Sequence, residues 1–205
     1  MVGIVDYGVG NLFSLCRSFE AVGENALVSG DPGVLDGTDR IILPGVGAFG
    51  DAARKLEESG LGEYVVSRAK AGTPLLGICL GMQLLFDRSY EFGVHRGLGL
   101  IAGEVVPLEG NIPQELKIPH IGWNALKPVP GARLFGGLGK GDCVYFVHSY
   151  YAKCAPRFVS AYTEYGADIT AAAESGNVFG CQFHPEKSGR TGLGILKAFC
   201  GLSGG

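Results

Sequence analysis

The chain has 205 residues, of which 46% are hydrophobic and only 18% are charged. This composition is that of a compact globular protein and excludes a disordered one. The net charge of −3 gives no electrostatic reason to expect nucleic acid or an anionic membrane as a partner. No apolar stretch approaches the roughly 20 residues that cross a bilayer, and the first residues do not resemble a signal peptide. We therefore expect a cytoplasmic protein with no nucleic-acid or membrane partner.

Six cysteines are scattered along the chain and include no Cys-x-x-Cys pair. None lies at metal-ligand spacing with a histidine, so we expect no bound metal and no cofactor. In the cytoplasm the cysteines should stay reduced. Five of them are interpreted as small apolar residues, whereas Cys79 lies in a glycine-rich turn that indicates chemistry.

The first half of the chain alternates short apolar runs with amphipathic segments. Helices are predicted where apolar residues recur at helical spacing, over residues 11–22, 48–58, 61–71 and 80–88. Strands are predicted over residues 2–6, 40–43 and 74–78. This alternation of strands and helices predicts a parallel sheet that is covered on both faces.

From about residue 93 to residue 174 the pattern changes to short strands separated by turns. Five strands are predicted there, over residues 104–106, 123–126, 143–147, 158–163 and 169–173. We expect them to form an antiparallel extension of the sheet, followed by a last strand at 177–183 and a closing helix at 193–200. With no linker or repeat, the expectation is one domain over residues 1–205, of the α/β class, with a mixed, mostly parallel central sheet flanked by helices.

The strongest local signal is Gly77-Ile78-Cys79-Leu80-Gly81, which lies between a predicted strand and a predicted helix. A Gly-x-nucleophile-x-Gly turn in this place is typical of a nucleophile elbow, which presents its nucleophile at the carboxyl edge of the sheet. The helix N-terminus that follows favours the thiolate of Cys79. Taken alone, a motif this short is equally compatible with a buried structural cysteine.

A base is available in His184, within Gln182-Phe183-His184-Pro185-Glu186. If the strand at 177–183 runs parallel to its neighbours, His184 lies at the same sheet edge as Cys79. The proline that follows favours an extended backbone, and residues two apart in an extended segment point to the same side. Glu186 is then placed to orient the imidazole. We therefore predict that Cys79, His184 and Glu186 act as nucleophile, base and orienting acid.

The other three histidines are weaker candidates for the base. His95 lies in a glycine-rich loop and is expected to be solvated. His120 is expected to be structural or interfacial. His148 follows a predicted strand and is a candidate to line the site, but no carboxylate lies two residues after it.

Two backbone groups are candidates for an oxyanion hole. The N–H of Leu80 comes directly after the nucleophile and is the first donor. The second is expected from Pro44-Gly45-Val46-Gly47, which follows the strand at 40–43, and the N–H of Val46 is the preferred donor. Taken alone, this segment is also compatible with a simple glycine-rich turn.

Taken together, these segments resemble the class I (triad) glutamine amidotransferases, in order and in spacing. Many members have Gly-His-Gln after the cysteine, where this chain has Gly81-Met82-Gln83. Further segments are similar to the branch of the family that supplies ammonia to a cyclase of histidine biosynthesis. They are Asp6-Tyr7-Gly8-Val9-Gly10-Asn11-Leu12, Pro119-His120-Ile121-Gly122-Trp123-Asn124, His148-Ser149-Tyr150-Tyr151 and His184-Pro185-Glu186-Lys187-Ser188-Gly189.

The resemblance implies that glutamine is the substrate and that Cys79 forms a thioester with it, releasing ammonia and then glutamate. It implies a heterodimer with a (β/α)8-barrel cyclase subunit, which uses the ammonia to make imidazole glycerol phosphate. The implied partner-facing positions are Asn11, Trp123 and Lys187. Trp123 is equally compatible with a core anchor, and Lys187 with a solvated charge. The implied glutamine-binding positions are Gly45, Gly47, Gln83, Glu91, Ser149 and Tyr150.

Three alternatives stay open. One is a glutaminase of the same family that serves another synthase, such as that of the pyridoxal phosphate pathway, although the segments around Trp123 and Lys187 argue against it. Another is a cysteine hydrolase or peptidase of similar fold, which has no need for glutamine-binding residues. The third is a binding module without catalysis, which the complete set of nucleophile, base and acid disfavours.

Overall fold

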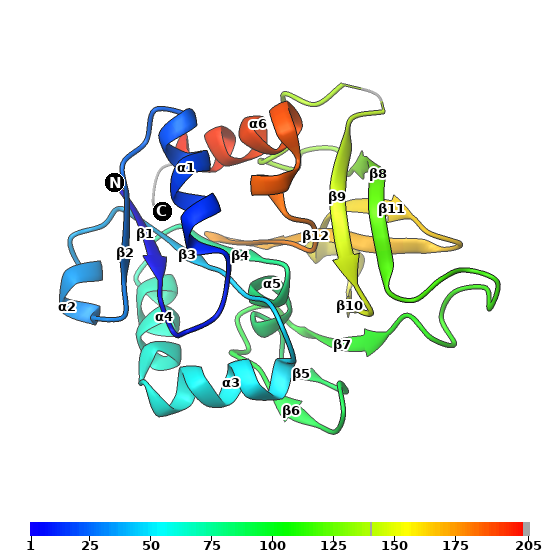
Figure 1. The fold of residues 1–205 in the computed structure, drawn as a ribbon, viewed down its shortest axis with the longest axis horizontal. Helices are drawn as coiled ribbons and strands as arrows, with labels where there is room; N and C mark the ends of the chain where they lie inside the picture. The colour runs from blue at the N-terminus through cyan, green and yellow to red at the C-terminus, as the bar shows by residue number, and fades with distance from the viewer. Residues whose placement is uncertain (140, 203–205) are drawn as a thin grey trace.

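One mixed sheet runs through the middle of the protein (Figure 1). The structure is a computed structural model that describes residues 1–139 and 141–202. Among these residues, nine strands form the sheet, in the spatial order β2 (Ala26–Ser29), β1 (Val2–Val5), β3 (Arg40–Leu43), β4 (Leu75–Ile78), β13 (Val178–Cys181), β12 (Asp168–Ser175), β11 (Val159–Glu164), β8 (His120–Pro128) and β9 (Cys143–His148). Neighbours from β2 to β13 pair in parallel, and neighbours from β13 to β9 pair antiparallel. The predicted α/β class, with a parallel core and an antiparallel extension, is confirmed.

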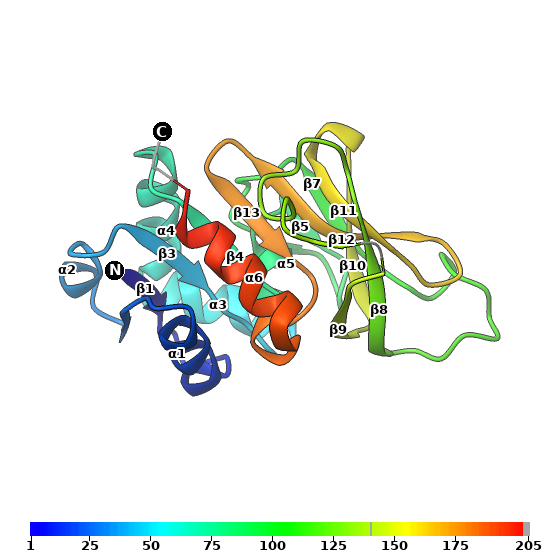
Figure 2. The same ribbon diagram turned by 90° about the horizontal axis from the view of Figure 1, so that it is seen from above.

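Helices cover both faces of the parallel half of the sheet (Figures 1 and 2). The helices on one face are α1 (Leu12–Ala21) and α6 (Gly189–Cys200), and those on the other are α3 (Phe49–Glu58), α4 (Leu61–Lys70) and α5 (Leu80–Leu84). Phe19 of α1 and Phe199 of α6 are fully buried in one apolar cluster, and Phe49 and Leu56 of α3 are buried in another. Because both faces are covered, strands such as β1 and β4 consist entirely of buried residues.

A second sheet of four strands is formed by other described residues, in the order β10 (Tyr150–Cys154), β7 (Gly103–Pro107), β5 (Arg88–Ser89) and β6 (His95–Arg96). The chain passes from the main sheet to this one at Ser149, which separates β9 from β10. The strand predicted at 104–106 therefore does not extend the main sheet, because β7 pairs with β10 instead. The helix predicted at 80–88 ends at Leu84, and its last predicted residue, Arg88, is the first residue of β5.

Two elements between residues 26 and 35 carry weak sequence signals. β2 is an edge strand of half-buried residues and lacks a buried apolar run. The short helix α2 (Pro32–Leu35) begins after Asp31, whose carboxylate accepts the N–H of Gly33 at 2.8 Å. An aspartate cap followed by proline is a normal helix start, but one turn is too short to show periodicity. Among the described residues, no helix has the length and apolar character needed to span a membrane.

Candidate active site

Cys79 lies in the turn between β4 and α5, with φ 54° and ψ −112°. A positive φ is strained for a residue with a side chain, and strain of this kind gathers at functional sites. The backbone N–H of Cys79 donates to the carbonyl of Cys181 in β13 at 2.8 Å. A Cβ at Gly81 would collide with the carbonyl oxygen of Leu43, so only glycine lets α5 begin against β3. The turn has the geometry predicted for a nucleophile elbow.

His184 lies at the same sheet edge as Cys79, because β13 runs parallel to β4 with Cys181 beside Ile78. The backbone of His184 is extended, with φ −100° and ψ 98°. Its Nδ1 lies 2.7 Å from Oε1 of Glu186, and Cys79 is close enough to raise the pKa of the imidazole. The three residues of the predicted trio are therefore brought together.

The charges around His184 favour its protonated form. Burial lowers the pKa of His184, but the hydrogen bonds with Cys79 and Glu186, and their negative charges, raise this pKa from 6.5 to about 9. At neutral pH the imidazole is therefore a cation that can give a proton to a leaving group. Oε2 of Glu186 is buried without a hydrogen-bond partner among the described residues. The hydrogen bond and positive charge of His184 are therefore the main interactions that stabilise this buried carboxylate.

The segment that follows β3 packs directly against the elbow. A Cβ at Gly45 would lie 2.7 Å from the backbone nitrogen of Gly81 and 2.9 Å from Cβ of Leu80. The predicted oxyanion donors, Val46 and Leu80, therefore belong to segments in close contact. The hydroxyl of Tyr7 anchors the loop by donating to the carbonyl of Pro44 at 2.7 Å. Burial and the charge of Cys79 raise the pKa of Tyr7, which keeps this hydroxyl protonated. Sequence reasoning did not single out Tyr7.

Gly47, at the end of the same loop, has φ 93°. This is a conformation that glycine adopts without strain. The peptides before Gly47 are therefore joined to α3 by a residue that can change its dihedral angles at little cost.

Three of the residues predicted to bind glutamine, Gln83, Ser149 and Tyr150, meet around the carbonyl of Tyr150. Nε2 of Gln83 donates to this oxygen at 3.0 Å, and Ser149 precedes it where the chain changes sheets. Glu91 also has a local contact, because its carboxylate accepts the N–H of Phe49, the first residue of α3, at 2.5 Å. A carboxylate at a helix N-terminus is stabilising, so Glu91 stabilises the start of α3, and its predicted role in glutamine binding stays a prediction.

His148 and His120 form a buried pair behind this carbonyl. Nδ1 of His148 lies 2.9 Å from the oxygen of Tyr150, and Nε2 lies 3.0 Å from Nδ1 of His120. Burial lowers the pKa of His148 to about 3 and also lowers the pKa of His120. Because a carbonyl only accepts, His148 is a neutral donor that holds the Tyr150 backbone. His95 was expected to be solvated, but it is half-buried. The centre of its ring lies 6.4 Å from the centre of the Phe49 ring.

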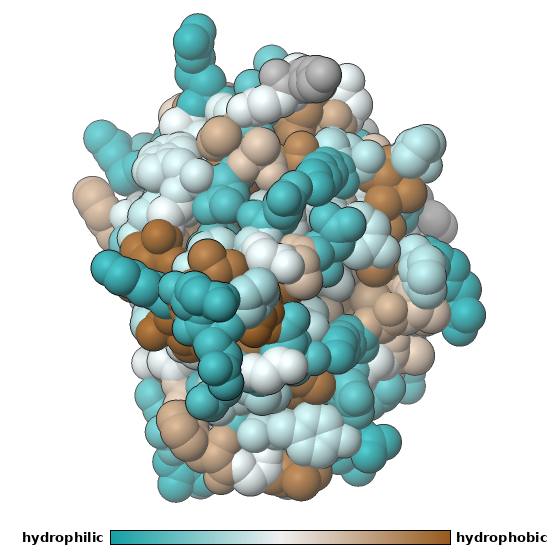
Figure 3. All heavy atoms as spheres, turned by 90° about the vertical axis from the view of Figure 1, so that its right-hand side faces the viewer, coloured by the Kyte–Doolittle hydropathy of each residue, from teal (hydrophilic) through white to brown (hydrophobic). Residues whose placement is uncertain are grey.

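The three residues predicted to face a partner are exposed. Trp123 is 56% exposed, which excludes the alternative of a core anchor. Nζ of Lys187 lies 5.8 Å from the centre of the Tyr145 ring. Asn11 also has a local role, since its side chain accepts the N–H of Ser14 at 3.3 Å and caps α1. Figure 3 views the right-hand side of Figure 1 and shows apolar patches interspersed with polar residues.

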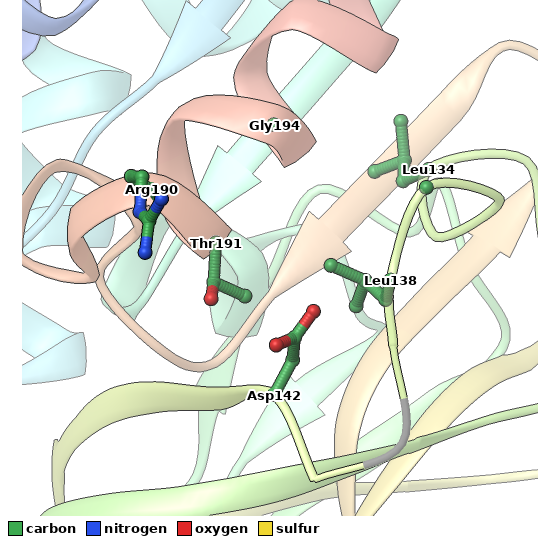
Figure 4. Close-up of a pocket in the computed structure, with 7 residues that line it drawn as sticks. Leu134, Leu138, Asp142, Arg190, Thr191 and Gly194 are labelled. Atoms are coloured by element: carbon green, nitrogen blue, oxygen red, sulfur yellow. The ribbon is translucent and has the colours of Figure 1, made fainter.

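A separate pocket of about 350 Å³ lies at the start of α6. Figure 4 shows that Thr191 of α6 and Asp142, just before β9, face the same space. Its other lining residues are Leu134, Gly137, Leu138, Arg190 and Gly194. None of the predicted site residues belongs to this pocket, so it is distinct from the site around Cys79.

The fold and the site define a glutamine amidotransferase. A family model described as glutamine amidotransferase class-I matches residues 4–200, and the chain belongs to this family. A solved structure titled "Crystal structure of glutamine amidotransferase" has the same fold, with a TM-score of 0.75 at 19% identity, covering 97% of this chain and 98% of that one.

Closer relatives place the chain in one branch of the family, the HisH subunits of imidazole glycerol phosphate synthase. The HisH subunit of Caldanaerobacter subterraneus is 48% identical over 200 residues, covering 97% of each chain. The HisH subunit of Carboxydothermus hydrogenoformans is 50% identical over 198 residues, covering 96% of this chain and 97% of that one. The sequence-based assignment to this branch is confirmed, and it is favoured over a glutaminase of the pyridoxal phosphate pathway.

Proposed function

We propose that the chain hydrolyses glutamine to glutamate and ammonia through a thioester on Cys79, and delivers the ammonia to a (β/α)8-barrel cyclase that makes imidazole glycerol phosphate. The observation that carries this proposal is the position of His184, which is hydrogen-bonded to Glu186 and lies close enough to Cys79 for the two groups to interact. A cysteine–imidazole–carboxylate arrangement is the one that acyl transfer from an amide requires.

In the first half of the reaction, the sulfur of Cys79 attacks the side-chain carbonyl carbon of glutamine. The tetrahedral oxyanion is stabilised by the N–H of Leu80 and by the N–H of Val46, and the loss of one such donor typically costs about 10²–10³ in rate. The protonated His184 gives its proton to the nitrogen of the amide as the C–N bond breaks. Ammonia leaves, and the glutamyl group stays on the sulfur as a thioester.

In the second half, the now neutral His184 takes a proton from water. The hydroxide attacks the thioester carbon, the C–S bond breaks, and glutamate leaves while Cys79 returns to its thiolate. Glu186 holds the ring in one tautomer throughout. The atoms of glutamine and water account for both products, glutamate and ammonia.

The partner is proposed from the names of the relatives, which are subunits of imidazole glycerol phosphate synthase. Asn11, Trp123 and Lys187 are proposed to face the barrel cyclase, and their exposure supports this placement. Ammonia would pass through the barrel core to a ribonucleotide. The cytoplasm as location and a single domain over residues 1–205 also remain predictions.

A free glutaminase would waste glutamine, so we propose that the loop Pro44–Gly47 couples the two subunits. Tyr7 holds the carbonyl of Pro44, while Gly45 and Gly47 flank Val46 and permit its peptide to turn. The oxyanion hole of the isolated chain is proposed to be incomplete until the partner binds its own substrate. Glutaminase rates measured alone, with partner, and with partner and its substrate test this. Equal rates in all three conditions would rule it out.

The proposed function is tested with Cys79→Ala in the reconstituted pair. We expect glutamine-dependent synthesis to be lost, while added ammonium salts still support the cyclase reaction. Cys200→Ala, which removes a buried thiol at the end of α6, is the matched control and should keep both activities. Loss of the ammonium-dependent reaction in Cys79→Ala, or retention of the glutamine-dependent one, would show that the division of labour is wrong.

A further inference from the structure

Gln182 lies between the nucleophile and the predicted glutamine-binding residue Gln83. It follows β13 directly and is fully buried. Its Oε1 accepts a hydrogen bond from Nε2 of Gln83 at 2.9 Å, and its Nε2 donates to the sulfur of Cys79 at 3.8 Å. A buried amide next to a reactive sulfur is costly unless both its ends are paired, and both ends of Gln182 are.

The orientation of both amides is fixed by one backbone group. The carbonyl of Tyr150 only accepts, so the atom of Gln83 that faces it at 3.0 Å must be the donor Nε2. The second hydrogen of that nitrogen points to Gln182 and requires the acceptor Oε1 there. The remaining end of Gln182, which faces the sulfur of Cys79, is therefore its N–H group. Nδ1 of His148 lies 2.9 Å from the same carbonyl oxygen. This second hydrogen bond holds the carbonyl of Tyr150 in place.

We propose that Gln182 is a positioning residue with two tasks: it aims an N–H donor at the Cys79 sulfur, and it holds Gln83 with its carbonyl oxygen turned to the substrate. A hydrogen bond to the charged form of a group stabilises that form, so the first task favours the thiolate over the thiol. The second task rests on the proposed function, because it concerns the binding of glutamine.

The second task also assigns a chemical role to Gln83. Both hydrogens of its Nε2 are used, by Tyr150 and by Gln182. Its Oε1 is then the polar atom that a ligand meets, and it accepts N–H or O–H groups only. Of the polar groups on a glutamine molecule, the α-ammonium is the strongest donor. Gln83 therefore selects an amino acid over an amide that lacks the α-amino group.

The first task is tested by alkylation of Cys79 with iodoacetamide over a range of pH, followed by mass spectrometry of the peptide that contains it. This uses the isolated chain and needs no substrate. Gln182→Met keeps the volume and removes both hydrogen bonds. Gln182→Glu keeps the acceptor for Gln83 but places a carboxylate at the sulfur. We expect the midpoint of alkylation to rise by about half a pH unit or more in Gln182→Met, and by more than about one in Gln182→Glu.

Gln114→Glu is the charge-matched control, because Gln114 is exposed and does not contact the site; its midpoint should equal that of the parent chain. A purely structural role would lower the melting temperature of Gln182→Met without moving its midpoint, and that outcome would overturn the first task. If Gln182→Glu does not fold, the alkylation midpoint of Gln182→Met alone tests the first task.

The second task is tested by steady-state kinetics in the reconstituted pair. We expect Gln182→Met to raise KM for glutamine about tenfold or more, and Gln182→Glu to raise it less, since the Gln83 contact survives. The ratio of kcat/KM for glutamine over glutaramate, which lacks the α-ammonium, should fall in Gln182→Met. An unchanged ratio would overturn this task. If the parent pair does not hydrolyse glutamine, the proposed function fails, while the alkylation result still decides the contact with Cys79.

Discussion

The backbone of His184 is hydrogen-bonded to Tyr145 of β9, whose carbonyl oxygen accepts the His184 N–H at 2.9 Å. The hydroxyl of Ser188 completes a clamp, because it accepts the N–H of Tyr145 at 3.0 Å and donates to the carbonyl of His184 at 2.6 Å. Ser188 is buried, so water does not compete for these bonds. The clamp joins the segment that carries the proposed base to the antiparallel half of the sheet.

Ser188→Ala should release this clamp. The N–H of Tyr145 and the carbonyl of His184 lose a partner, and a buried polar group left unpaired costs about 1–3 kcal/mol. We expect a loss of unfolding free energy of that size in chemical denaturation. Because a small displacement of a catalytic group slows a reaction strongly, kcat for glutamine hydrolysis in the reconstituted pair should fall at least about tenfold.

Ser67→Ala is the control for this prediction, because Ser67 is an exposed serine on α4. Its unfolding free energy should stay within about 0.5 kcal/mol of the parent value. A normal kcat in Ser188→Ala would mean that the clamp does not position His184.

Trp123→Ala should weaken binding of the partner subunit while the isolated chain stays stable. Trp123 is 56% exposed on β8, and its ring lies 6.0 Å from that of Tyr145, so the tryptophan is presented to solvent on a rigid strand. Buried aromatic anchors at interfaces contribute about 2 kcal/mol or more, which corresponds to roughly a thirtyfold loss of affinity. Titration calorimetry with the barrel subunit measures this change.

Val34→Ala is the matched control for Trp123→Ala. Val34 is an exposed apolar residue on α2, which lies at the opposite end of the molecule from β8 (Figure 1). Its affinity for the partner should be unchanged. Equal affinities of both variants would place the interface elsewhere on the surface.

The parts of the site that sequence could predict are those with local signals. The elbow around Cys79 is set by glycines two residues on either side, and the spacing of His184 and Glu186 follows from an extended backbone. Gln182 carries a weaker signal: a polar residue between the apolar residues of a buried strand and the histidine must find a partner. Its partners Gln83 and Cys79 are about 100 residues away in sequence, so only the strand pairing reveals them.

Partners that are distant in sequence also explain the errors in the predicted fold. The strand at 104–106 was predicted correctly as a strand, but its partner β10 follows the change of sheets at Ser149, which has no local signature. Tyr7 and Ser188 were named in motifs without a role, because their partners Pro44 and Tyr145 come from distant strands. The local residue pattern therefore predicts which segments form helices and strands. Which strands pair with one another depends on contacts between residues that are far apart in the sequence.

The stability of the protein should fall as the pH rises from about 6.5 to 9. The pKa of His184 is about 9 in the folded chain, against 6.5 without the fold. A group whose pKa is raised by folding stabilises the fold below the unfolded value and loses that contribution as the pH rises through the folded value. At about 1.4 kcal/mol per pH unit, the contribution of His184 is roughly 3 kcal/mol.

His184→Asn removes this titration and is the variant that tests it. Urea denaturation at pH 6.5, 8 and 9.5 should show a smaller decrease in unfolding free energy for the variant than for the parent chain. Parallel decreases in the two proteins would contradict the assigned role of His184.

On the acid side, stability should fall as the pH drops from about 6.5 towards 3, because of His148. Burial holds the pKa of His148 at about 3 in the folded chain, against 6.5 without the fold, so the unfolded chain takes up the proton first. Stability then decreases with falling pH over this window, by up to roughly 4–5 kcal/mol for this shift. That is a large share of the 5–15 kcal/mol that typically separates folded from unfolded domains.

His148→Gln keeps a side-chain N–H that can donate to the carbonyl of Tyr150 but does not titrate. We expect it to be less stable than the parent chain at pH 7 and to lose less stability between pH 6.5 and 4, so that the two denaturation midpoints converge as the pH falls. His95→Gln changes a half-buried histidine of β6 and serves as the control, with the acid profile of the parent. If the unfolding free energy of His148→Gln falls with pH in parallel with that of the parent chain, carboxylates govern acid unfolding instead. One such carboxylate is Asp39, whose pKa is lowered by its contact with the N-terminal amine.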